Sequence, residues 1–435
     1  MRLSVVGCGY LGAVHAAAMA QLGHEVVGVD VDGAKVASLS RGEPPFHEPG
    51  LTEVLASALA SGRLRFSTDI ADAAGASVHF IAVGTPQRKG EGAADLTFVE
   101  SAIDALLPQL RAGDLVVGKS TVPVGTAAGL AERVRATGAD LAWNPEFLRE
   151  GFAIADTLTP DRLVYGVPAG ASGEAARARL DEVYASALAA GTPTVVTDYA
   201  TAELVKVAAN AFLATKISFI NAMAEIAEVA GGDVTQLADA IGMDARIGRQ
   251  FLNAGIGFGG GCLPKDIRAF TARAEELGRG ESVGFLKEVD AINLRRRDRV
   301  VELAVSALGG EPFQKRVAVL GLSFKPHSDD VRDSPALDVA VRLHGLGADV
   351  VATDPQAMAN ARRLQPQLQF ADSAIEAVRD ADVVVLVTEW PEYRDLTARE
   401  LARVARGRTI IDARNVMDPV AWRAAGWTYV GLGRP

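Results

Sequence analysis

The feature that most constrains the fold is a glycine pattern near the N-terminus, Gly7-Cys8-Gly9-Tyr10-Leu11-Gly12. It directly follows the apolar run 3–6 and precedes the apolar segment 13–22, which we expect to be helical. Glycines with this spacing, between a strand and a helix, allow a tight turn and let a pyrophosphate approach the helix N-terminus. The pattern therefore predicts a strand–turn–helix unit that binds a dinucleotide.

Asp30 supports this interpretation. It ends the next apolar run, 25–29, and lies 18 residues beyond Gly12. An acidic residue near this distance accepts the hydroxyls of the adenosine ribose in dinucleotide-binding units. It also repels a 2′-phosphate, so the sequence favours NAD over NADP. The alternative is a glycine turn followed by a capping aspartate, which the agreement of strand, spacing and acid disfavours.

Strand-like and helix-like segments alternate at both ends of the chain. We expect buried parallel strands at 3–6, 25–29, 78–83 and 115–117, and again at 317–320, 349–352, 383–387 and 409–411. The segments LGHEVVGVD, ending at Asp30, and LGADVVATD, ending at Asp354, match closely. This pattern predicts an α/β protein with two Rossmann-like, doubly wound domains.

The second copy has changed at its glycine loop, which reads Gly321-Leu322-Ser323-Phe324-Lys325-Pro326. Without the second and third glycines a dinucleotide pyrophosphate cannot bind in the same way, so we expect this domain to hold a different ligand. Lys325 either contacts a phosphate there or is only a surface charge.

Strand signals disappear between the two copies, from about 199 to 276. One long helix is expected over 201–229, ended by Gly231-Gly232. At 1.5 Å per residue it would span about 43 Å, enough to bridge two domains or to pack against a second subunit. We therefore expect three domains, at 1–198, 199–300 and 301–435, with the helical region used for dimerisation.

Composition and charge narrow the classes of function. The 435 residues, 49% hydrophobic and 23% charged, are typical of a folded protein with two or three domains. A net charge of -10 disfavours nucleic-acid binding. The N-terminus enters a strand without a signal peptide, and no apolar run approaches the roughly 20 residues of a membrane span. We expect a cytoplasmic protein without a cysteine-based zinc site, because the chain has only two cysteines.

One of these cysteines ends a glycine-rich loop, Gly257-Phe258-Gly259-Gly260-Gly261-Cys262, with Lys265 and Asp266 just beyond it. The glycines are expected to let the backbone approach a ligand closely. A thiol becomes a nucleophile where cations or backbone N–H groups stabilise its thiolate, and a structural cysteine is the equally weighted alternative. Nothing near Cys8 indicates reactivity.

Lys206 and Asn210 are four residues apart on the long expected helix and therefore share a face. Their neighbours are apolar. A lysine in this setting either extends toward solvent or belongs to a polar site, and the pairing with Asn210 favours the site.

Together these motifs resemble the UDP-glucose/GDP-mannose dehydrogenase family over essentially the whole chain. The resemblance rests on GCGYLG, VGTP at 83–86, STVPVGT at 120–126, NPEFLREG at 144–151, the helix from 203, GFGGGCLPKD at 257–266 and GLSFKPHSDDVRDSP from 321. The chain departs from the family at Gly261, where many members carry serine or another residue.

The resemblance implies a four-electron oxidation of the C6 alcohol of a nucleotide sugar, with two NAD and no release of the aldehyde. UDP-glucose is the favoured substrate, and GDP-mannose, UDP-GlcNAc or UDP-ManNAc are alternatives. An aldehyde must add a nucleophile before it can lose a second hydride, so Cys262 would form a thiohemiacetal and then a thioester. The other implied catalytic residues are Lys206 and Asn210 for oxyanions, Asp266 as base, Glu146 for hydrolysis, and Thr121.

The resemblance also implies the binding residues. NAD would be contacted by Gly7, Gly9, Tyr10, Leu11, Gly12, Asp30, Lys35, Thr85, Thr121, Glu150, Lys265 and Arg332. The nucleotide sugar would be contacted by Phe147, Leu148, Arg149, Glu150, Lys206, Asn210, Phe251, Leu252, Asn253, Gly255, Phe258, Gly259, Phe324, Lys325 and Arg414. Arg246 would reach the sugar bound to the neighbouring subunit, so that a homodimer completes the site.

Two other classes compete with this interpretation. A two-electron dehydrogenase of the 3-hydroxyacid type would share the first domain and the long helix, but it would not need Cys262 or a second α/β domain. A catalytically silent nucleotide-sugar sensor would not need Cys262, Lys206, Asn210 and Asp266 together.

Overall fold

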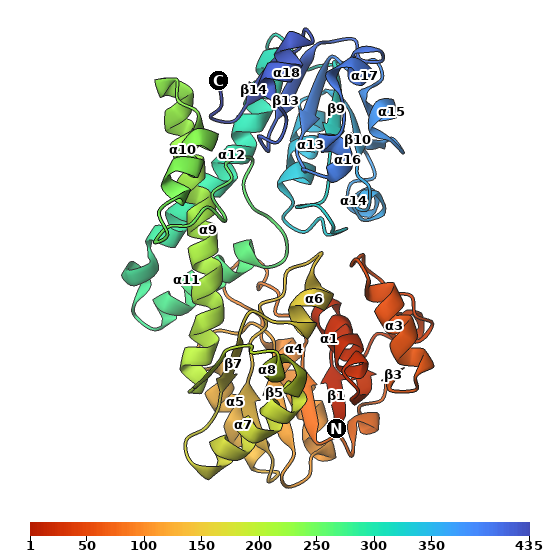
Figure 1. The fold of residues 1–435 in the computed structure, drawn as a ribbon, viewed down its shortest axis with the longest axis vertical. Coiled ribbons are helices and arrows are strands. Elements are labelled where there is room, and N and C mark those ends of the chain that lie inside the picture. Colours follow the sequence, from red (N-terminus) through yellow and green to blue (C-terminus); the bar gives the residue numbers. More distant parts are fainter. The chain divides into compact units, whose positions relative to one another are not determined.

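The computed structural model describes residues 1–435, which divide into two compact units. The first unit contains residues 1–209 and 272–278, and the second contains 210–271 and 279–435. Helices α9 (Tyr199–Ala230) and α11 (Leu263–Glu276) contribute residues to both units (Figure 1).

The first unit is built on an eight-stranded sheet with the order β3-β2-β1-β4-β5-β6-β7-β8. All neighbouring strands are parallel except β6 and β7. The first six strands follow the order 3-2-1-4-5-6 that characterises the Rossmann fold. The strands are β1 (Arg2–Val6), β2 (Glu25–Val29), β3 (Leu64–Ser67), β4 (Val78–Ile81), β5 (Leu115–Gly118), β6 (Asp140–Trp143), β7 (Leu163–Gly166) and β8 (Thr194–Thr197).

Apolar side chains cover both faces of this sheet because successive residues of a strand point to opposite sides. In β4, Val78 and Phe80 pack into one core with Leu3 and Val5, whereas Ile81 packs into the other with Val6. The covering helices are α1 (Tyr10–Gln21), α2 (Gly33–Ser40), α3 (Leu51–Ala60), α4 (Thr97–Leu106), α5 (Thr126–Arg135), α6 (Ala153–Leu158), α7 (Ala171–Val183) and α8 (Ala185–Ala189), with short 3-10 turns η1 (Ile70–Ala73) and η2 (Leu107–Gln109).

The second unit contains a six-stranded, wholly parallel sheet with the order β11-β10-β9-β12-β13-β14. Numbered from its own first strand, this order is again 3-2-1-4-5-6, so the predicted second Rossmann-like domain is confirmed. The strands are β9 (Arg316–Leu320), β10 (Asp349–Thr353), β11 (Gln369–Phe370), β12 (Val383–Leu386), β13 (Thr409–Asp412) and β14 (Thr428–Gly431).

Helices of the second unit fall into two groups in the sequence. Before the sheet come α10 (Val234–Gly242), η3 (Gly280–Val283) and α12 (Phe285–Ala307), together with most of α9 and α11. Along the sheet come α13 (Pro335–Gly345), α14 (Met358–Leu364), α15 (Ala374–Val378), α16 (Pro391–Arg394), α17 (Ala398–Ala402) and α18 (Pro419–Ala424). No strand occurs between 199 and 276, as the sequence predicts.

The long helix predicted over 201–229 is α9, which has 32 residues. It ends where Gly231 takes a φ of 75°, and the N–H groups of Gly231 and Gly232 both donate to the carbonyl of Ala227. This is the glycine-terminated helix end expected from the sequence.

Helix α9 corrects one expectation, because by length and composition alone it could cross a membrane. Core helices of soluble proteins pass the same test. Polar side chains of α9 bond to other segments: Glu203 accepts the N–H groups of Gly125 and Ala127, at 2.7 Å each, and Ser218 donates to the Val289 carbonyl at 2.7 Å. These bonds tie α9 to two other segments of the protein.

Candidate active site

The glycines of the loop between β1 and α1 have two roles: some are needed for close packing, and one leaves open space. Gly7 has a φ of 91°, and a methyl group on it would lie 2.6 Å from the Val83 side chain. A methyl group on Gly12 would lie 1.8 Å from the Gly7 carbonyl oxygen, whereas one on Gly9 would meet nothing within 4 Å. The loop is therefore closed on the protein side and open beside Gly9 at the N-terminus of α1, where a pyrophosphate could approach.

Asp30 and Lys35, both predicted to contact the cofactor, form an ion pair with 2.8 Å between Nζ and Oδ2. Asp30 is buried, and its Oδ2 also accepts the N–H of Cys8 at 2.7 Å. Its Oδ1 accepts only the N–H of Asp32, at 3.0 Å. A carboxylate oxygen has two acceptor positions, so Oδ1 can still accept a ribose hydroxyl.

The first cysteine has the structural role expected from the sequence. Cys8 is fully buried and its backbone N–H holds Asp30. Burial, and secondarily the negative charge of Asp30, raise the pKa of the Cys8 thiol far above its ordinary value. This thiol is therefore not a nucleophile at neutral pH.

Tyr10, the first residue of α1, connects the glycine loop to the NPEFLREG segment. Its hydroxyl donates to the buried carboxylate of Glu48, which also accepts the N–H groups of Gly151 at 2.6 Å and Ala153 at 2.7 Å. Burial and the bond to Glu48 raise the pKa of Tyr10. Glu48 thereby fixes the start of α6 against α1.

Glu146 lies between a lysine and a backbone donor. Its Oε1 is 3.1 Å from Nζ of Lys206, and its Oε2 accepts the N–H of Leu148 at 2.7 Å. Lys206 is 5% exposed, so its contact with this carboxylate lies away from solvent. Phe147 packs under both cations nearby, with its ring centre 5.5 Å from Lys206 Nζ and 3.8 Å from the Arg162 guanidinium.

Other predicted residues of the first unit are placed as follows. Thr85 is buried and donates from its hydroxyl to the Thr121 carbonyl at 2.8 Å, so these two predicted NAD contacts meet. Arg149 is exposed and forms an ion pair with Asp156 at 2.7 Å. Glu150 is half-buried, and its charge contributes to the raised pKa of Tyr10.

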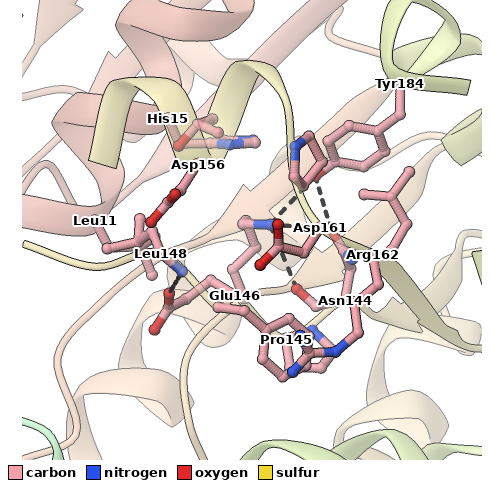
Figure 2. Close-up of a pocket in the computed structure, with 15 residues that line it drawn as sticks. Leu11, His15, Asn144, Pro145, Glu146, Leu148, Asp156, Asp161, Arg162 and Tyr184 are labelled. Atoms are coloured by element: carbon pink, nitrogen blue, oxygen red, sulfur yellow. Dashed lines mark hydrogen bonds between the residues drawn. The ribbon is translucent and has the colours of Figure 1, made fainter. Parts of the chain in front are cut away.

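A cavity of about 50 Å³, lined by both polar and apolar side chains, lies beside the NPEFLREG segment, within the first unit. Figure 2 shows His15, Leu11, Asp156 and Leu148 on one side of it and Tyr184, Asp161, Arg162 and Asn144 on the other. The buried Lys119 also lines it, with Nζ 3.0 Å from Asn144 Oδ1 and 3.2 Å from the Tyr184 hydroxyl. Burial lowers the pKa of Lys119 to about 8, while Glu146 raises it and Lys206 lowers it further.

In the second unit, Cys262 immediately precedes α11 and is exposed. Its carbonyl accepts the N–H of Asp266 at 2.9 Å, in the first turn of the helix. A thiolate at a helix N-terminus is stabilised by the helix dipole and by free backbone N–H groups. The position therefore fits the predicted nucleophile.

Asp266 is buried and organises its neighbours. One of its oxygens is 2.6 Å from Lys265 Nζ, and the other accepts the Asn210 side-chain amide at 2.6 Å. Because each oxygen has a second acceptor position, a water could still bind to Asp266. Its role as a general base stays a prediction.

The three glycines before Cys262 are explained by packing against the protein itself. A methyl group on Gly259 would lie 2.3 Å from the Asp333 carbonyl oxygen, and one on Gly260 would lie 2.8 Å from the Phe324 ring. A methyl group on Gly261 would lie 2.5 Å from the Arg332 guanidinium carbon. The close backbone approach expected for a ligand is thus made by the segment 322–335, which brings Phe324 and Arg332 to the cysteine loop.

Arg414 holds this loop in place, while its predicted contact with the nucleotide sugar stays a prediction. Its guanidinium donates to the carbonyls of Gly257 at 2.9 Å and Phe324 at 3.1 Å, and it pairs with Glu389 at 3.0 Å. Lys325 lies over the Phe324 ring, with 5.4 Å to the ring centre.

The remaining predicted sugar contacts lie before the cysteine loop, except Phe258, which belongs to it. Leu252 and Phe258 are buried, and Phe258 exchanges two hydrogen bonds with the Asn293 side chain, at 2.7 and 2.9 Å. Gly255 donates its N–H to Asn221 at 2.8 Å, Asn253 accepts from Arg249 at 2.8 Å, and Phe251 has a φ of 64°. Arg246 extends outward, paired with Asp244 and with 89% of its side chain exposed.

Sequence reasoning missed several charged or polar residues that the structure places at the site. Glu48, His15, Lys119 and Tyr184 all line or brace it, as described above. A signal existed for Lys119, because it directly follows the buried strand β5 at the edge where such sheets bind ligands. Nothing in the sequence distinguished His15 within an apolar helix.

A Rossmann strand order, an open glycine loop and an acid at the end of β2 define a dinucleotide-dependent α/β protein, and the exposed Cys262 at a helix N-terminus adds a candidate nucleophile. Comparison with known families makes this specific. The NAD binding, central and UDP binding domains of the UDP-glucose/GDP-mannose dehydrogenase family match residues 1–188, 200–295 and 318–419. The chain belongs to this family.

Individual relatives match over the whole length. A UDP-glucose 6-dehydrogenase of Rhizobium meliloti is 42% identical, with 100% of each chain covered. The structure is also similar to a UDP-glucose dehydrogenase from the hyperthermophilic archaeon Pyrobaculum islandicum, with a TM-score of 0.89, 40% identity and 100% and 98% of the two chains covered. A UDP-D-ManNAc dehydrogenase from Pyrococcus horikoshii has a TM-score of 0.86 at 28% identity, with 100% and 99% covered.

Proposed function

We propose that the chain is an NAD-dependent UDP-glucose 6-dehydrogenase, which converts UDP-glucose, two NAD+ and water into UDP-glucuronate and two NADH, with release of protons. The observation that carries this proposal is 42% identity over the full length to a UDP-glucose 6-dehydrogenase, with Cys262, Lys206, Asn210 and Asp266 present together. The alternative substrates are GDP-mannose, UDP-GlcNAc and UDP-ManNAc. The UDP-D-ManNAc dehydrogenase matches at only 28% identity, which favours UDP-glucose.

The residues of the first unit fit NAD. Gly9 leaves room for the pyrophosphate, and Asp30 keeps an acceptor for the adenosine ribose. Tyr10, Leu11, Lys35, Thr85, Thr121 and Glu150 would complete its binding site, and Lys265 and Arg332 are proposed to contact it as well. When bound, NAD+ supplies the hydride acceptor for each of the two oxidations.

The residues of the chain would act in sequence on the C6 carbon. Asp266 accepts the alcohol proton, through a bound water, while Lys206 and Asn210, one turn apart on α9, stabilise the developing oxyanion. Cys262 then adds to the aldehyde through Sγ, giving a thiohemiacetal, and the second oxidation leaves a thioester. Water, activated by Glu146, releases UDP-glucuronate and regenerates the thiolate.

We also propose a homodimer formed through α9. Phe212, Phe219 and Ile226 recur every seven residues on this helix and are 67%, 48% and 59% exposed. Large apolar side chains aligned on one helix face usually pack against a partner. The outward Arg246 would then be available to the sugar site of the second subunit.

The domain division 1–198, 199–300 and 301–435 and a cytoplasmic location complete the proposal. A chain with only two cysteines, neither of them in a disulfide, fits a reducing compartment.

The test follows NADH formed by purified protein with NAD+ and a panel of nucleotide sugars. Two NADH per UDP-glucose are expected, and one NADH with free aldehyde, or none, would contradict the proposal. Cys262→Ala should block turnover while leaving NAD affinity nearly unchanged. Cys8→Ala is the matched control, because this buried thiol has no catalytic role in the proposal.

A further inference from the structure

We propose that the cavity lined by Lys119, His15, Asn144 and Glu146 is a water-binding chamber that supplies the water for thioester hydrolysis and passes it to Glu146. The inference rests on the proposed four-electron reaction, since only that reaction consumes water. It adds a binding site in which Lys119, His15 and Asn144, which have no role in the scheme above, take part.

The size of the chamber suits a few ordered waters. Its volume is about 50 Å³, and one water requires roughly 10 to 15 Å³, which gives room for about three to five. Side chains of both charges line it. Lys119 and Arg162 are the cations, and Glu146, Asp156 and Asp161 are the carboxylates. This lining favours water over an anion or an apolar ligand.

His15 provides the clearest sign that water binds there. It is 1% exposed, and neither ring nitrogen has a hydrogen-bond partner within the protein. Burial, and secondarily the charge of Lys119, lower its pKa well below the ordinary value, so the ring is neutral with one donor and one acceptor. Leaving both unpaired would be costly, and waters in the chamber would satisfy them.

The opposite wall is fixed by hydrogen bonds. Lys119 donates to Asn144 and Tyr184, the Tyr184 hydroxyl donates to Asn144 Oδ1 at 2.7 Å, and the Asn144 amide donates to the Val164 carbonyl at 2.9 Å. Asn144 lies two residues before Glu146 in the same segment (Figure 2). The chamber therefore has a rigid polar wall that continues into the residue assigned to hydrolysis.

The hydrolytic step balances with one chamber water. The water oxygen bonds to the thioester carbon, and the carbon–sulfur bond breaks with its electron pair going to Cys262 Sγ. The products are a carboxylate, a thiolate and two protons, the first of which passes to Glu146. The remaining waters can carry that proton from Glu146 toward solvent and replace the water consumed.

Two variants test the chamber by different means. His15→Phe keeps a ring against Phe80, whose centre is 4.4 Å away, but removes both ring nitrogens. Thr157→Met puts a longer side chain into the cavity from α6. Tyr165→Phe is the matched control, because it removes another buried, unpartnered polar group of the same unit that does not line the chamber.

Rapid mixing with UDP-glucose and NAD+ should separate the steps. We expect the first burst of NADH to stay within about twofold of wild type in both variants, while steady-state turnover falls on the order of tenfold, as for loss of one well-ordered water. Intact-mass measurement should then show the Cys262 thioester accumulating during turnover, whereas Tyr165→Phe should show neither effect. His15→Gln, which retains a donor and an acceptor, should recover part of the rate.

Three results would each overturn the proposal of a water-binding chamber. They are a burst and a turnover that fall together, a slow turnover without accumulated thioester, and wild-type behaviour in both variants. If His15→Phe does not fold, Thr157→Met decides by the same criteria. Failure of the four-electron reaction itself would appear separately, as fewer than two NADH per UDP-glucose in wild type.

Discussion

Asp30 and Asp354 occupy the same position in two sheets of the same strand order, but their surroundings differ. Asp30 has one oxygen with a single backbone donor and a lysine on the other. Asp354 is 1% exposed, and both of its oxygens are saturated by the N–H groups of Leu322, Ser323, Gln356 and Ala357, the Ser323 hydroxyl and the Trp390 indole. The first acid can serve a ligand, whereas the second stabilises its own loop.

The preceding glycine loops differ in the same sense. Gly7 and Gly321 both take positive φ values, 91° and 109°. Each packs against a residue just beyond the end of a neighbouring strand in its sheet, Val83 after β4 and Thr388 after β12, so the tight turn is common to the two sheets. Ser323 stands where Gly9 leaves open space, and its hydroxyl bonds to Asp354. Only the first sheet therefore keeps both this position and the acid available to a dinucleotide.

The largest effect is expected at Gly12. Its methyl group would meet the Gly7 carbonyl at 1.8 Å, so Gly12→Ala must displace the loop or α1. We expect kcat/KM for NAD+ to fall at least about 100-fold, as for a misplaced binding group, while UDP binding to the second unit persists. Steady-state kinetics and UDP titration measure the two; an unchanged kcat/KM would show that the loop does not hold NAD.

The two aspartates can be exchanged for asparagine. The Asp354→Asn substitution replaces one carboxylate oxygen with an NH2 group, which leaves buried N–H donors such as those of Leu322 and Ser323 short of an acceptor. This should lower the free energy of unfolding by about 1 to 3 kcal/mol, the cost of a buried unpaired donor. Asp30→Asn should instead raise KM for NAD+ and weaken discrimination against NADP+. Urea unfolding and kinetics with both cofactors measure these effects. The comparison would be wrong if Asp30→Asn lost the stability and Asp354→Asn changed the KM for NAD+.

The pH dependence of stability should be concentrated in the first unit, at Lys119. Its pKa in the folded protein is about 8, below the roughly 10.4 of an unfolded lysine. Between these values the unfolded chain binds a proton that the native chain does not, so stability rises with pH, by up to about 3 kcal/mol.

Removing this lysine should remove that slope. Lys119→Met should show a smaller gain in urea stability than wild type between pH 7.5 and 10, and the exposed Lys315→Met should behave as wild type. Identical slopes in all three proteins would mean that burial does not lower the pKa of Lys119 in the folded protein.

The smallest effect is expected at Gly9. A methyl group there meets no protein atom within 4 Å, so Gly9→Ala should leave the melting temperature nearly unchanged. NAD+ affinity should still fall roughly tenfold, because the pyrophosphate needs this space. A loss of stability without a loss of affinity would assign Gly9 to folding.

How much the sequence could predict follows from the same residues. The two doubly wound domains and α9 were predictable, because apolar runs and helix-ending glycines are local signals. Six strands of four residues or fewer were missed, namely β3, β6, β7, β8, β11 and β14, and β8 carries two exposed valines. Short strands with little alternation are set by their neighbours in the sheet.

The candidate site was predictable only in part. Motifs identified Asp30, Lys206, Asn210 and Cys262, but His15 and Glu48 acquire their roles through contacts across 65 to 105 residues, such as Glu48 with Ala153 and His15 with Phe80. The purpose of Gly259, Gly260 and Gly261 was also hidden, because the segment that packs on them lies in the second sheet's loop. Such long-range packing leaves no spacing in the sequence.

The most direct test of the comparison is an equilibrium titration of the wild-type protein with NAD+, in the absence and presence of saturating UDP. If only the first sheet holds a dinucleotide, one NAD+ binds per chain and UDP does not displace it. Two NAD+ per chain, or displacement of NAD+ by UDP, would contradict the account.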